Sequence, residues 1–71
     1  MNLPEWRVYN NRWFRLLSYK STGAAWIPAA QIKASTTEII TPIDDMTRHF
    51  ATEEEANYFA LGMAIKWMNA N

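Results

Sequence analysis

The chain has 71 residues, with seven basic and seven acidic side chains and no cysteine. This length holds one small domain, residues 1–71, and without cysteine its core can rely neither on a disulfide nor on a cysteine-bound zinc ion. The balanced charge is also unlike that of a dedicated nucleic-acid binder, which is usually basic.

The first predicted element is a β-hairpin. After a loose lead-in over residues 1–4, residues 5–9 have strand character and residues 12–19 form the returning strand. Asn10 and Asn11, which separate the two strands, tolerate positive φ and therefore suit a two-residue turn.

The register of this hairpin leaves apolar side chains on both faces. With a two-residue turn, Val8 faces Trp13 and Trp6 faces Arg15. The opposite face also mixes aromatic, apolar and basic side chains: Arg7, Tyr9, Arg12, Phe14 and Leu16. A helix can cover only one of these faces, so the other is left for solvent, a partner or the rest of the chain.

Short strands and turns follow the hairpin. Residues 20–23 form a turn, and residues 24–27 form a third strand that ends at Pro28, which lacks an amide hydrogen. Residues 29–34 fit either a helical turn or an irregular edge, and residues 38–41 form a candidate fourth strand. The remaining connections are expected to be a loop and a turn: residues 35–37 and residues 42–47.

The C-terminal segment predicts one helix, over about residues 53–68. Thr52 is a good N-cap, and Glu55 follows three residues later. In such a capping box the Thr52 hydroxyl accepts from the Glu55 amide, while the Glu55 carboxylate reaches back to the Thr52 amide. Glu53, Glu54 and Glu55 also place negative charge at the positive end of the helix dipole.

This helix has apolar side chains on two sides. One set forms the expected core stripe: Ala56, Phe59, Ala60, Met63, Ala64 and Trp67. A second set lies nearly opposite: Tyr58, Leu61, Ile65 and Met68. We expect this second set to form the interface of a homodimer or to bind a protein partner, because exposed apolar patches on small proteins usually mark interfaces. The alternative is that residues 28–47 fold over it within the same chain.

The charges are unevenly distributed, and this suggests a second type of partner. Residues 1–33 are mostly basic, whereas residues 34–71 are mostly acidic. Aromatic side chains beside cations can stack bases and neutralise phosphates, so nucleic-acid binding by the hairpin is the alternative function. The candidate contacts are Arg7, Arg12, Trp13, Arg15 and Lys20. The favoured explanation of the aromatic side chains is that they fill a small core.

The sequence offers no constellation for catalysis. His49 is the only histidine, and Asp44 and Asp45 are adjacent, so in a strand they would point to opposite faces. We therefore expect no enzymatic activity, no cofactor and no bound metal. The chain also lacks a signal peptide and an apolar run of about 20 residues, which predicts a soluble cytoplasmic protein without membrane contact.

Residues 50–56, continued by Ala60, Ala64 and Trp67, resemble the strand-to-helix junction of several small uncharacterised bacterial domains that combine a three-stranded sheet with one helix. The resemblance covers about a quarter of the chain and implies no functional residue. Together the predicted elements indicate an α+β fold, a three- to four-stranded antiparallel sheet packed against one C-terminal helix. We expect it to act as a non-enzymatic binding or assembly module.

Overall fold

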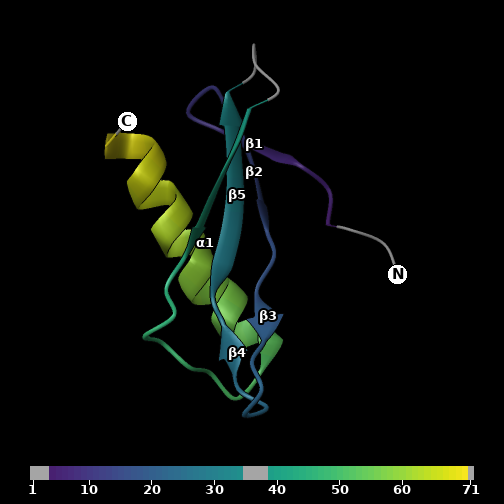
Figure 1. Cartoon of the computed structure of the whole chain (residues 1–71). Coiled ribbons are helices and arrows are strands. Elements are labelled where there is room, and N and C mark those ends of the chain that lie inside the picture. The colour runs from purple at the N-terminus through teal and green to yellow at the C-terminus, as the bar shows by residue number, and fades with distance from the viewer. Residues whose placement is uncertain (1–3, 35–38, 71) are drawn as a thin grey trace.

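The computed structural model of the chain describes residues 4–34 and 39–70. It contains an antiparallel sheet with one helix on one of its faces, which confirms the predicted α+β class (Figure 1). The elements are β1 (Arg7–Tyr9), β2 (Arg12–Leu16), β3 (Tyr19–Lys20), β4 (Trp26–Ile27), β5 (Ala29–Ala34), β6 (Ile40–Asp44) and α1 (Glu53–Ala70). The loop expected at residues 35–37 and the strand start expected at Glu38 lie outside the described residues.

The N-terminal hairpin forms in the predicted register. Asn10 and Asn11 both have positive φ, 52° and 62°, and Val8 pairs with Trp13. Positive φ at both central positions defines the turn whose twist matches that of the flanking strands. The four main strands then follow the order β1-β2-β5-β6, all antiparallel.

The β2–β5 pair continues beyond the main sheet as the small β3–β4 pair, with a break at Pro28. Side chains replace part of the strand pairing at this break. The Ala29 amide donates to the Ser18 hydroxyl at 3.4 Å, and the Ser18 amide donates to Oδ1 of Asn57 on α1 at 3.3 Å. Asn57, a polar residue within the apolar helix, therefore connects the helix to the break.

The prediction for residues 29–34 was wrong, because this segment is the central strand β5. Ala30 and Ile32 are fully buried, whereas Gln31 and Lys33 are half-buried on the other face. This period of two is the strand pattern, although it covers only a few residues. The adjacent strand β6 extends to Asp44, so Pro42 lies inside an edge strand rather than in a turn.

The helix begins as predicted and ends at Ala70, two residues later than expected. The Glu55 amide donates to Oγ1 of Thr52 at 3.2 Å, which confirms the N-cap. The Glu55 carboxylate accepts from the Thr52 hydroxyl at 3.1 Å instead of reaching the Thr52 amide. Of the two hydrogen bonds in the predicted capping box, the one from the Glu55 amide to the Thr52 hydroxyl therefore forms as expected.

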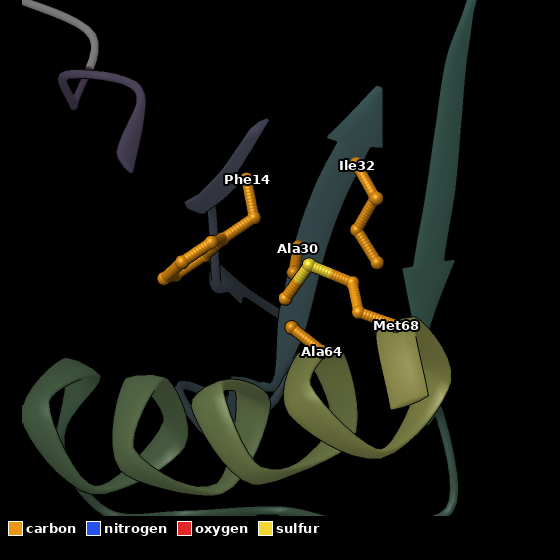
Figure 2. Packing of buried hydrophobic residues seen from close by; sticks show 5 residues of the cluster. All are labelled: Phe14, Ala30, Ile32, Ala64 and Met68. Atoms are coloured by element: carbon orange, nitrogen blue, oxygen red, sulfur yellow. The ribbon is translucent and has the colours of Figure 1, made fainter. Parts of the chain in front are cut away.

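The helix packs through small residues spaced four apart. Ala56, Ala60 and Ala64 are fully buried, and Met68 continues this row. Figure 2 shows Ala64 and Met68 facing three residues of the sheet, namely Phe14, Ala30 and Ile32. Alanine side chains on both α1 and β5 let the helix axis approach the sheet closely. The longer Met68 side chain fills the space between helix and sheet at the C-terminal end of this row.

This packing corrects the predicted stripe. Ala56, Ala60 and Ala64 of that stripe are buried as predicted. Phe59, Met63 and Trp67 are half-buried, because the alanine row itself faces the sheet, although Trp67 still packs against the core cluster. Met68, expected on the second face, is 0% exposed and belongs to the core, and Leu61 packs against the same cluster.

The hairpin turn holds the C-terminal end of the helix. Asn10 Nδ2 and Arg12 Nη1 both donate to the Met68 carbonyl, at 3.1 and 2.9 Å. The last carbonyls of a helix lack intrahelical donors and carry partial negative charge. The Arg12 guanidinium therefore satisfies a carbonyl and complements the dipole at the same time.

Candidate functional site

The solvent-facing side of α1 carries large apolar side chains. Tyr58 is 80% exposed, Ile65 is half-buried, and Gly62 lies between them on the exposed surface. A β-carbon at Gly62 would meet nothing within 4 Å. We call the surface of Tyr58, Gly62 and Ile65, with Glu55 and Lys66 beside them, the outer face of α1.

An open hollow of about 1000 Å³ follows this face near the N-terminal half of the helix. Tyr58, Leu61 and Gly62 line it from the helix, and Phe50 lines it from the segment that leads into the helix. Charged side chains also border the hollow: Asp45, Glu54, Glu55 and Lys66. Protein interfaces commonly combine apolar and charged side chains.

Of the four residues expected to form a contact, the structure leaves Tyr58 and Ile65 facing outward. Leu61 lies at the margin, since it both packs against the core and lines the hollow. Met68 is not on this surface at all. The missed feature is Gly62, whose open surroundings become evident only once the side of the helix that faces the sheet is known.

The sheet face opposite the helix carries a second group of side chains. Two cations lie over the Trp6 ring. The Arg15 guanidinium carbon is 4.4 Å and the Lys33 ammonium nitrogen is 4.5 Å from the ring centroid. Arg15 Nε also donates to Oε1 of Gln31 at 2.9 Å. Trp13 pairs with Lys33, so it belongs to the same face. We call this surface the open sheet face.

The structure separates the basic residues that the sequence grouped together. Trp13 and Arg15 lie on the open sheet face, whereas Arg7 and Arg12 lie on the helix side by their strand register. Arg12 is half-buried and binds the helix end. Lys20 is on the separate strand β3. Lys33 was missed because its segment was not recognised as a strand.

The residues considered for catalysis lie in and around the turn after β6. The Asp45 carboxylate accepts from the amide of Thr47 at 3.0 Å and from its hydroxyl, which lowers the pKa of Asp45. Partial desolvation, followed by a 3.1 Å hydrogen bond to Asp44, raises the pKa of the Tyr19 hydroxyl. His49 is exposed and does not line the hollow. The Asp45 contacts order the turn, whereas the hydrogen bond from Tyr19 to Asp44 links β3 to the end of β6.

Residues 4–34 and 39–70 contain no group of three or more histidine, cysteine, aspartate or glutamate side chains that could hold a metal ion. In this described part, α1 also falls short of the length and apolarity that a membrane-spanning helix needs.

Comparisons of the chain with protein-family models, with curated proteins and with solved structures find no match. The surfaces of the described residues are therefore the observations from which a function can be proposed.

Proposed function

We propose that this chain is a non-enzymatic assembly module that self-associates through the outer face of α1. The observation that carries the proposal is the 80% exposed side chain of Tyr58 beside an open hollow, with the half-buried Ile65 on the same side of the helix. Burying such surface between two molecules removes apolar area from water, at about 25 cal/mol per Å². A small domain without disulfides gains stability in this way.

The other surfaces are less suited to self-association. The edge strand β6 contains Pro42, which has no amide hydrogen to donate to another strand, and the opposite edge β1 has three residues. On the open sheet face, a two-fold contact would bring Arg15 and Lys33 toward their own copies. Like charges in a contact oppose association.

The variant Ile65→Asp tests this proposal. We expect it to remain folded by circular dichroism and to lose self-association in sedimentation or light scattering, because a carboxylate would be desolvated in the contact. Val8→Asp is the matched control, since Val8 is 59% exposed on the open sheet face. A folded Ile65→Asp variant that associates as the wild type does would refute the proposed surface.

A second candidate, binding of single-stranded nucleic acid, is favoured by the open sheet face. Trp6, with Arg15 and Lys33 beside it, offers a ring for base stacking and two charges for phosphates. This set shares only Arg15 with the basic residues expected from the sequence.

Tryptophan fluorescence in the presence of an oligothymidylate would measure such binding. The expected result is quenching that weakens with added salt and with the double variant Arg15→Gln/Lys33→Gln, because the phosphate contacts are electrostatic. Arg7→Gln, on the other face, is the control. Quenching that is absent at low salt, or that is unchanged in the double variant, would exclude this candidate.

A further inference from the structure

The outer face of α1 carries opposite charges at its two ends. Glu55 is in the first turn, and Lys66 follows 11 residues later; both are exposed. At about 100° per residue, 11 residues bring the two side chains to within about 20° of each other around the helix. They therefore lie along one edge of the same face, about 16 Å apart along the axis.

We infer that the partner of this face is a second copy of the chain, with the two helices antiparallel. The inference rests on the proposed self-association and adds its geometry. An antiparallel pair brings Glu55 of each copy toward Lys66 of the partner's helix, twice by symmetry. A parallel pair would instead put Glu55 level with Glu55 of the partner and Lys66 level with Lys66, so neither charge would meet an opposite charge.

The apolar side chains give the same alignment. Tyr58 and Ile65 lie within about 20° of each other around the helix, so each can cover the other across an antiparallel contact. The charged pair places the two-fold axis midway between residues 55 and 66, and the apolar pair places it midway between residues 58 and 65. Both midpoints fall within about 2 Å of Gly62 along the helix.

Gly62 then lies where the two helices are closest. A glycine at this position removes the side chain that would hold the backbones apart, and the space around it is open. This assigns a role to the one residue of α1 that weakens the helix, since glycine costs about 1 kcal/mol relative to alanine in a helix interior. The remaining contact is that of one helix pair, which is small, so we expect dissociation constants in the micromolar range.

Because the chain has no cysteine, single cysteines report the alignment directly. Gly62→Cys lies near the two-fold axis, and oxidation should cross-link it as a dimer, since a disulfide requires Cα atoms within about 7 Å. Asn69→Cys is the matched control, because Asn69 is exposed on the same side of α1 but lies near the C-terminal end of the helix. Its two copies would be about 24 Å apart along the antiparallel axis.

The expected result is cross-linking of Gly62→Cys and its absence in Asn69→Cys. Comparable cross-linking of both would show a parallel contact and overturn the inference, while leaving the proposed self-association intact. Dimers in sedimentation without cross-linking of Gly62→Cys would also overturn the inference alone. A protein that is monomeric at all concentrations would end both proposals.

A charge exchange supplies an independent check. Glu55→Lys should raise the dissociation constant about 10-fold, since it replaces two attractions with two repulsions, and Glu55→Lys/Lys66→Glu should restore the wild-type value. Glu53→Lys is the control, because it removes the same charge from the first turn but lies about 160° away around the helix. Failure of the double variant to recover association would contradict the antiparallel pairing.

Discussion

Ala24 occupies a backbone conformation that normally favours glycine. Its φ is 63°, at the end of the turn between β3 and β4, although Gly23 precedes it without a positive φ. The left-handed conformation costs a residue with a β-carbon about 1–2 kcal/mol, whereas glycine adopts it freely. Gly23 therefore suggests the turn in the sequence, but it does not identify the strained position.

Replacement of Ala24 by glycine should stabilise the protein. The expected gain in the free energy of unfolding is about 0.5–1 kcal/mol, because relief of the strain exceeds the added entropy of the unfolded chain. Urea denaturation measures it. The same change one residue later, Ala25→Gly, should destabilise, and a loss of stability in both variants would contradict the strain assigned to Ala24.

Asp45 makes stability depend on pH. Its pKa is lowered in the folded state, first by the hydrogen bonds from Thr47 and then by Arg48 at 3.8 Å. A group with a lowered folded pKa stabilises above its unfolded pKa, near 3.9, and this contribution is lost as the pH falls through the folded pKa.

We expect Asp45→Asn to be less stable than the wild type at neutral pH, with the difference shrinking as the samples become more acidic than about pH 4. Denaturation at a series of pH values checks this. A difference that stays constant down to the most acidic samples would show that the Asp45 charge is not responsible.

At the scale of the elements, the alanine row of α1 decides which side of the helix is buried. Sequence periodicity identified the helix and its cap, but it placed Phe59, Met63 and Trp67 in the core together with the alanine row, and Met68 on the opposite side. Hydrophobicity alone gives the large side chains more weight. Instead, the alanine row packs closely against Ala30 of β5, so this side of the helix faces the sheet and Met68 is buried with it.

Met68→Ala should therefore act as a core mutation. We expect a loss of about 2–5 kcal/mol in the free energy of unfolding, because a fully buried side chain leaves a cavity. The control is Met46→Ala, whose side chain is 69% exposed and should change stability by less than about 0.5 kcal/mol. Equal effects in the two variants would be inconsistent with the observed packing.

In the sheet, local sequence patterns predict the strands of the first hairpin but not the strand that depends on long-range pairing. The first hairpin was predictable down to its register, because Asn10 and Asn11 determine the turn locally. The central strand β5 has short alternation, with Pro28 just before it, and it becomes a strand through pairing with β2 and β6. Because residues 29–34 were not predicted as a strand, Lys33 could not be placed beside Trp6 from the sequence.

At the scale of the whole molecule, the outer face of α1 and the open sheet face differ in charge and in the partner proposed for each. The helix covers one sheet face (Figure 1), the cations Arg15 and Lys33 lie on the other, and the outer face of α1 combines apolar side chains with both signs of charge. The sequence predicted this apolar helix surface through Tyr58 and Ile65. It could not separate them from Met68, because that distinction depends on the rotation of the helix against the sheet.

The most direct test of self-association is sedimentation equilibrium of the wild-type protein, from about 1 μM to about 1 mM, the range in which a micromolar contact responds to concentration. We predict an average mass that rises from that of one chain toward that of two, with the rise lost in Ile65→Asp. A mass of one chain across the whole range would contradict the proposal that the outer face of α1 joins two copies.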